Sequence, residues 1–153
     1  MVMVRPFEVG LVVRDLGPME RFYCDVIGCR PVRRSRVPVA VGGPAGLGGE
    51  LDVVRLQVPS GGCVKLILPS SPAVPALVAH PLAGRAGLSY LTFCVDNVDP
   101  VVAALGAAGA KPCRDPVVVR AHGRRITFWA DPEGNAVELV DDRGEESGPG
   151  RSN

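Results

Sequence analysis

Short segments of alternating apolar and polar residues run through most of the chain. Alternation with a period of two is typical of strands that bury one face, and the abundance of valine in these segments also favours strands. Clusters of glycine and proline separate the segments, as expected at turns. We expect strands at residues 8–13, 30–37, 51–58, 63–68, 88–95, 116–120, 124–130 and 136–140.

One helix is expected in each half of the chain. The first is predicted by apolar residues at the i, i+3, i+4, i+7, i+8 spacing of a core-facing helix, namely Met19, Phe22, Tyr23, Val26 and Ile27. Pro18 suits the first helical position, and Gly28 suits the residue of positive φ that ends a helix. For the second helix we expect Asp99 as the N-cap, Pro100 in the first turn and Gly109 at the end.

The two halves of the chain resemble each other. Glu8 aligns with Tyr90 at an offset of 82 residues, and residues 64–67 align with 137–140 at an offset of 73. Ordered similarity of this kind indicates a repeat of one supersecondary unit. The order of elements predicts an α+β fold of two βαβββ modules, in which each helix covers one face of a sheet and leaves the other face to form a cleft.

The modules are expected at residues 5–69 and 88–142, joined by a proline-rich linker at 70–87. Each module alone would be only marginally stable, so the two should share one core. Residues 1–142 are therefore expected to form a single domain. Residues 143–153 are charged and rich in glycine and serine, which is typical of a disordered tail.

Composition narrows the classes of function. The 153 residues carry a formal net charge of +1, which argues against a nucleic-acid partner. Arg30, Arg33, Arg34 and Arg36 cluster on an expected edge strand, where a solvated strand face is favoured over an anion site. The N-terminus lacks the features of a signal peptide, and no apolar run reaches the ~20 residues of a membrane span, so no membrane partner is expected. Five cysteines without a CxxC pair fit reduced thiols in a cytoplasmic protein.

Four polar side chains are expected to converge on the cleft. Residues of one parity on neighbouring strands share a face, and the repeat makes Glu8 equivalent to Tyr90 and Lys65 equivalent to Glu138. Their neighbours of opposite parity are apolar and should face the helices. A lysine ammonium group between two carboxylates takes the electrostatic role of a cation and repels a divalent ion.

The segments that carry these features resemble a known family. EVGLVVRDL at 8–16, RFYCDVIGC at 21–29, YLTFCVDNVD at 90–99 and, most specifically, ITFWADPEGNAVELV at 126–140 are similar to the vicinal oxygen chelate superfamily. That superfamily includes glyoxalase I, extradiol dioxygenases, and the fosfomycin- and bleomycin-resistance proteins. The resemblance runs over residues 7–141. It implies paired βαβββ modules whose sheets curl around a cleft, often assembled as a homodimer, with a cleft formed within one chain or across two.

The resemblance also implies positions for a divalent metal. Enzymes of the superfamily usually hold the metal with one side chain from the first and last strand of each module, where histidine or glutamate is usual. Those positions fall here on Glu8, Lys65, Tyr90 and Glu138. Lys65 departs from the pattern, and we therefore expect no cofactor. The alternative is a metal held by Glu8, Tyr90 and Glu138 with Lys65 turned aside, and such oxygen ligands suit a hard metal ion better than zinc.

Two classes of function follow. The first is a metal-independent enzyme for isomerisation, epimerisation or cyclisation of a small carbonyl-bearing substrate, with Glu8 or Glu138 as base or acid and with Tyr90 and Lys65 stabilising an oxyanion. The second is a non-catalytic protein that sequesters a drug or metabolite, as the bleomycin-resistance branch does. The aromatic content of 5% is low for that role. A glyoxalase- or dioxygenase-type metalloenzyme is a further alternative, and a purely structural ion-pair network explains the same charges.

Other side chains are weaker candidates for ligand contacts. Trp129 and Phe128 alternate on one strand, so one faces the core and the other is free to stack on a ligand. Core packing is favoured for either residue, with Trp129 retained as a candidate ligand contact. Arg125 and Gln57 are candidate ligand-binding residues at the mouth of the cleft.

Two histidines and one loop complete the candidates. His80 falls in the linker and would reach the cleft only if the linker acted as a lid. A solvent-exposed loop histidine is favoured over a histidine of the cleft. His122 is expected at the surface in a hairpin turn. Residues 38–50 lack a periodic pattern and predict a long loop, of the kind that often forms a lid or binding segment.

Overall fold

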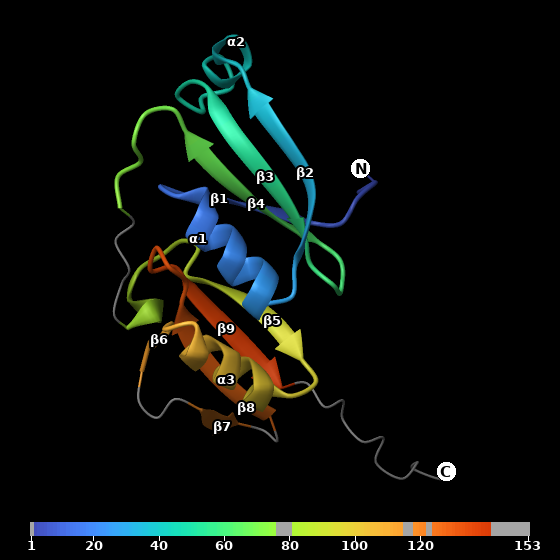
Figure 1. The fold of residues 1–153 in the computed structure, drawn as a ribbon, viewed down its shortest axis with the longest axis vertical. Coiled ribbons are helices and arrows are strands. Elements are labelled where there is room, and N and C mark those ends of the chain that lie inside the picture. The colour runs from blue at the N-terminus through green and yellow to red at the C-terminus, as the bar shows by residue number, and fades with distance from the viewer. Residues whose placement is uncertain (1, 76–80, 115–117, 122–123, 142–153) are drawn as a thin grey trace. The chain divides into compact units, whose positions relative to one another are not determined.

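The computed structural model of the protein describes residues 2–75, 81–114, 118–121 and 124–141 (Figure 1). The chain divides into two compact units, Met1–Ala76 and Leu77–Asn153, so the boundary lies inside the predicted linker. His80, His122 and the predicted tail lie outside the described residues. In the part of the chain that is described, no helix is long and apolar enough to span a membrane.

The first unit is a βαβββ module built on a four-stranded sheet. Its elements are β1 (Glu8–Val12), α1 (Leu16–Arg21) with a π-helical turn (Phe22–Val26), β2 (Arg30–Val37), α2 (Val39–Gly42), β3 (Leu51–Gln57) and β4 (Cys63–Pro69). The strand order is β1-β4-β3-β2, with β1 and β4 parallel and the other pairs antiparallel. The predicted strands of this half are confirmed, and β2 is the edge strand that the sequence predicts.

Alternation along these strands separates a buried face from a face that carries polar groups. Val64 and Leu66 on β4 and Leu56 on β3 are buried on the face that α1 covers, together with Met19 and Tyr23 of the helical segment. Residues of the other parity point away from α1, because successive side chains alternate across a strand. We call this second surface the open face of the first sheet.

The helix of the first unit begins two residues earlier than Pro18, the predicted first position. Asp15 is its N-cap, and the Asp15 Oδ1 accepts a hydrogen bond from the Gly17 amide at 2.9 Å. Gly28 has a φ of 84°, which confirms the predicted left-handed residue after the helix.

The predicted loop at residues 38–50 contains a helical turn, α2, that the sequence pattern missed. A segment of four residues is too short to show a helical period. The turn packs closely against the chain that follows it, since a Cβ at Gly42 would lie 1.9 Å from the Gly49 carbonyl oxygen. Only glycine fits at Gly42 without moving the backbone.

The second unit repeats the plan with an interrupted edge. Its elements are a 3₁₀ turn (Leu82–Gly84), β5 (Tyr90–Val95), α3 (Val98–Ala107), β6 (Lys111–Pro112), β7 (Val119–Ala121), β8 (Arg124–Ala130) and β9 (Ala136–Asp141). The strand order is β5-β9-β8-β6, and β7 also pairs with β8. Two short strands, β6 and β7, therefore pair with β8 where one long strand, β2, pairs with β3 in the first unit. The sequence pattern did not predict β6, and residues 116–117 of the predicted strand at 116–120 lie outside the described residues.

The N-cap of α3 is Asn97, so the prediction of Asp99 as the cap was wrong. The Asn97 side-chain oxygen accepts a hydrogen bond from the Asp99 amide at 3.0 Å. Both residue types favour the cap position, but Asn97 has the extended backbone that a cap needs, with φ −152° and ψ 124°.

The registers of the two sheets confirm the internal repeat. In the first sheet Glu8 pairs with Cys63 and Gly10 with Lys65. In the second sheet Tyr90 pairs with Ala136, and Thr92 pairs with Glu138. The first and last strands of each unit are therefore parallel and in the same register at equivalent positions, as the offsets of 82 and 73 require.

Two glycines at the end of α3 should respond to alanine in opposite directions. Gly106 lies inside the helix and Gly109 follows it with a φ of 71°, and a Cβ at either position would meet open space. We expect Gly106→Ala to raise the free energy of unfolding by about 0.5–1 kcal/mol. Gly109→Ala should lower it by about 1–2 kcal/mol, because an L residue is strained at positive φ. Urea denaturation of both variants measures the difference, and changes of equal sign would contradict this account of α3.

Candidate functional site

The open face of the first sheet carries a cluster of three ionic groups around Glu8. Arg55 Nε donates a hydrogen bond to Glu8 Oε1 at 2.8 Å, and Arg55 Nη2 forms an ion pair with the same oxygen at 2.6 Å. Lys65 Nζ lies 3.4 Å from the other oxygen, Oε2. The predicted pairing of Glu8 and Lys65 is present within the first unit, and its extension to Glu138 stays a prediction.

These groups are partly withdrawn from water. The exposed fractions of the side chains are 24% for Glu8, 27% for Arg55 and 39% for Lys65. Burial raises the pKa of Glu8, but the hydrogen bonds and charges of Arg55 and Lys65 outweigh that effect and leave its pKa below the usual value of 4.5. Glu8 is therefore held as a carboxylate.

Sequence reasoning missed Arg55, although a signal for it existed. Arg55 pairs with Lys65 in the antiparallel ladder of β3 and β4, so the two side chains share a face and lie side by side. The tight turn between β3 and β4 sets this register. Counting back from the turn would have placed Arg55 beside the candidate site.

The open face of the second sheet is the one that carries Tyr90, Thr92, Phe128 and Glu138. Phe128 and Thr92 are the cross-strand partners of Glu138. The Thr92 hydroxyl donates to Glu138 Oε2 at 2.5 Å. The exposed ring of Tyr90 packs edge-to-face on Phe128 with ring centroids 5.2 Å apart. Thr92 is a neighbour of the predicted site that sequence reasoning missed, and its parity with Tyr90 on β5 was the signal for it.

Equivalent positions of the two sheets therefore carry different chemistry. Glu8 and Arg55 form an ion pair in the first unit, and the equivalent Tyr90 and Phe128 form an aromatic pair in the second. The last strand supplies a cation at Lys65 and an anion at Glu138.

Two of the three predicted ligand-binding residues, Trp129 and Gln57, make structural contacts within the second and first unit. Trp129 is a buried core residue whose indole N–H donates to the Thr127 hydroxyl at 2.8 Å, and this placement makes Phe128 the residue on the open face. The Gln57 amide nitrogen donates to the Gly62 carbonyl at 2.7 Å, across the turn between β3 and β4. As ligand contacts, both residues stay predictions.

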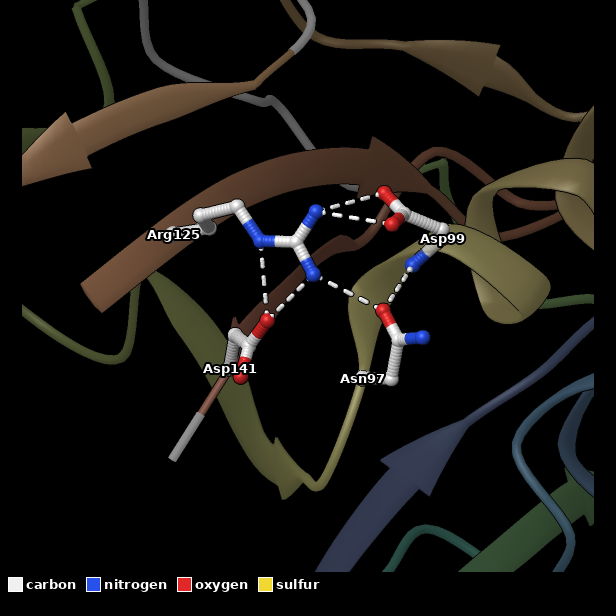
Figure 2. A network of polar contacts seen from close by, with 4 residues as sticks. All are labelled: Asn97, Asp99, Arg125 and Asp141. Atoms are coloured by element: carbon white, nitrogen blue, oxygen red, sulfur yellow. Dashed lines mark hydrogen bonds and ion pairs between the residues drawn. The ribbon is translucent and has the colours of Figure 1, made fainter. Parts of the chain in front are cut away.

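Arg125 lies in a network of polar contacts at one end of the second sheet (Figure 2). Its guanidinium donates to Asp141 on β9, to Asp99 on α3 and to the Asn97 side chain at distances of 2.5–2.8 Å. The exposed fraction of the Asp141 side chain is 3% and that of Arg125 is 13%. Arg125 thereby ties β8 to β9 and to the start of α3, and its ligand-binding role stays a prediction.

The residues of the first sheet do not fit a divalent metal. A metal ion at Glu8 would meet the guanidinium of Arg55 and the ammonium of Lys65, and like charges at such distances repel strongly. Within each unit, the described residues bring no three histidine, cysteine, aspartate or glutamate side chains together as ligands. All five cysteines are free thiols, and burial raises the pKa of Cys29 to about 11.

Comparison with known proteins identifies the family. The sequence model of the glyoxalase/bleomycin resistance protein/dioxygenase superfamily matches residues 7–128. The chain belongs to this superfamily. The resemblance seen in the sequence and the predicted α+β fold are both confirmed.

Relatives of this superfamily member cover nearly its whole length. An uncharacterized Escherichia coli protein, YaeR, is 27% identical over 88% of this chain and 93% of its own. The crystal structure of a glyoxalase family protein from Bacillus cereus is 23% identical with a TM-score of 0.77, covering 92% of this chain and 95% of that one. The trypanothione-dependent glyoxalase I of Leishmania major is 17% identical with a TM-score of 0.68, covering 92% and 88%. At these identities the structures establish a shared fold.

The stability that this superfamily member gains from Glu8 should depend on pH. Because the pKa of Glu8 is lowered in the folded state, its contribution is fully present above its unfolded pKa and is lost as the pH falls through the folded value. We expect Glu8→Gln to destabilise the protein more at neutral pH than at a pH below 4.5. Urea denaturation across this range measures the difference. A constant difference between the variant and the original chain would contradict the lowered pKa.

The two carboxylates bound by Arg125 should contribute unequally to stability. Asp141 is nearly buried, whereas the Asp99 side chain is 64% exposed. We expect Arg125→Met to lower the unfolding midpoint strongly, because it withdraws the guanidinium from a carboxylate that water barely reaches. Asp99→Asn should lower the unfolding midpoint only slightly, because exposed ion pairs contribute little to stability. Thermal unfolding compares them, and equal losses would show that the exposed pair dominates the network.

Proposed function

We propose that the chain is a metal-independent enzyme that performs acid–base chemistry on a small carbonyl-bearing metabolite. The proposal rests on one observation: Glu8 forms ion pairs with Arg55 and Lys65 at a position where the superfamily commonly has a metal ligand. A cationic cluster there supplies positive charge from the protein itself. The reaction class is an isomerisation, an epimerisation or a cyclisation.

Glu138 is the proposed proton acceptor. Glu8 is a poor candidate, because a carboxylate with a lowered pKa is a weaker base. Glu138 accepts one hydrogen bond, from Thr92, on Oε2, which leaves Oε1 without a donor among the described residues. This geometry supports a carboxylate that is oriented by Thr92 and keeps one oxygen available for a substrate proton.

Tyr90 is the proposed hydrogen-bond donor to the substrate. It lies one pleat from Thr92 on β5 and on the same face, so its hydroxyl belongs to the surface that presents Glu138. The contact with Phe128 holds the ring edge-to-face. A phenol placed in this way donates to a developing enolate oxygen, while Glu138 takes the proton from the neighbouring carbon.

A non-catalytic role in sequestering a metabolite is the second candidate. The exposed Tyr90 ring and its neighbour Phe128 supply an aromatic surface suited to binding without chemistry. We also propose that the protein acts in the cytoplasm as a homodimer, with a small molecule as its ligand. The free thiols of all five cysteines support a reducing compartment.

Exchange of carbon-bound hydrogen in D₂O tests the catalytic role of Glu138. A panel of 2-oxo and 3-oxo acids is incubated with the protein, and proton NMR follows loss of the signal next to the carbonyl. We expect exchange of at least one acid, and a loss of about 100-fold or more in Glu138→Gln, because proton transfer by a positioned side chain contributes on that scale. The same acid should still raise the unfolding temperature of Glu138→Gln, since binding does not require the base.

Glu50→Gln serves as the matched control, because Glu50 is a partly exposed carboxylate of the first unit whose ion pair with Arg36 is long, at 3.8 Å. Stabilisation by an acid without exchange, unchanged in Glu138→Gln, would replace the enzyme by the sequestering protein. Exchange that appears only after Mn²⁺, Ni²⁺ or Zn²⁺ is added would contradict metal independence.

A further inference from the structure

Strand β2 distributes its four arginines over both faces of the first sheet. Arg34 and Arg36 lie on the face that α1 covers, and each is neutralised there. Arg34 Nη2 lies 2.5 Å from Glu20 Oε1 of α1, and Arg36 Nε lies 2.9 Å from Asp52 Oδ1 of β3. These two arginines are explained by local ion pairs.

Arg30 and Arg33 lie on the opposite, open face. Arg33 pairs in the ladder with Arg55, and Arg30 pairs with Gln57, so each shares a face with its partner. Both are exposed, and the side chain of neither forms an ion pair or hydrogen bond with any residue that the structure describes. The separation of paired and unpaired arginines therefore follows the two faces of one strand.

A row of three cations crosses the open face. Arg33, Arg55 and Lys65 are successive cross-strand partners on β2, β3 and β4. Neighbouring strands are about 4.8 Å apart, so the row spans about 10 Å. Among the described strand residues of this face, Glu8 is the only acid, and it is engaged by Arg55 and Lys65. The Arg33 end of the row has no counter-charge among the residues that the structure describes.

The row of three cations lowers the stability of the sheet unless an anion offsets the repulsion between them. Like charges directly opposite on neighbouring strands destabilise a sheet. Glu8 relieves the repulsion between Arg55 and Lys65, but it is not bonded to Arg33. An oxyanion at Arg33 would remove the remaining repulsion, and guanidinium groups bind carboxylates and phosphates through two parallel hydrogen bonds.

We infer that the open face of the first sheet binds the oxyanion of a small ligand, a carboxylate or a phosphate, through Arg33 with Arg30 beside it. Arg55 supplies charge from the neighbouring strand while it remains bonded to Glu8. The row is about 10 Å long, which suits one or two anionic groups and is too short to follow the regularly spaced phosphates of a nucleic acid. The inference does not require proton transfer by Glu138.

Isothermal titration of the full chain with inorganic phosphate and with citrate, at matched ionic strength, tests the site. We expect measurable binding of one of these probes, which also decides between phosphate and carboxylate. Arg33→Gln should weaken that binding by about tenfold, a loss of about 1.4 kcal/mol. Arg30→Gln should weaken it less, because Arg30 lies outside the row.

Arg34→Gln and Arg36→Gln are matched controls, since they remove the same charge from the same strand on the opposite face. Both should bind within about twofold of the original chain. Equal weakening by all four variants would reveal a general effect of net charge and overturn the site. The site would also be overturned if neither phosphate nor citrate bound at millimolar concentration. Tighter binding of a DNA oligonucleotide that depends on Arg33 would overturn it as well. Circular dichroism of each variant confirms that it is folded.

Discussion

The chemistry of the first sheet depends on the ion pairs of Glu8 with Arg55 and Lys65. Arg55 and Lys65 are directly opposite on neighbouring strands, where two cations repel, and Glu8 on the adjacent strand contacts both. Because the three groups are partly exposed, solvent screens them, and their contribution to stability is modest. Their main effect is on what the face can bind. Glu8, the only carboxylate among the described strand residues of this face, is engaged by two cations, so the surface repels a metal cation and attracts an anion.

The two halves of the chain show that the scaffold and the chemistry of its open faces vary separately. Some residues that face the helices remain apolar at equivalent positions, as with Leu66 and Leu139, which are both fully buried. On the open faces the residue type changes at position after position. The equivalent pairs are Glu8 and Tyr90, Gly10 and Thr92, Arg55 and Phe128, and Lys65 and Glu138. Close packing constrains the shape of the residues that face the helices. The residues of the open faces do not pack in the core and can vary with the ligand that the protein binds.

Sequence patterns predicted the strands well, because one face of each strand is buried and the period of two survives in the residue types. The patterns were weaker wherever two residues suited one role. Asn97 and Asp99 are both good caps, and only backbone geometry selects Asn97. Likewise, Trp129 and Phe128 alternate, and the ladder pairing of Phe128 with Glu138 decides which of them shares the open face. Arg125 has partners 26 and 16 residues away in the chain, and no local pattern records such contacts.

The charge of the open face illustrates why composition alone is a poor guide to a binding surface. A net charge of +1 argues against a nucleic-acid partner but says nothing about how the charges are distributed over a sheet. On β2, a register shift between Pro31 and Arg33 places Arg30 and Arg33 on the open face, where neither side chain meets an acid among the described residues. Arg34 and Arg36 lie on the other face and meet acids from α1 and β3. The local excess of positive charge is therefore created by the register of β2 with β3. A small anion senses that local potential within a Debye length of about 8–10 Å, whereas a long polyanion also meets the acids beyond it.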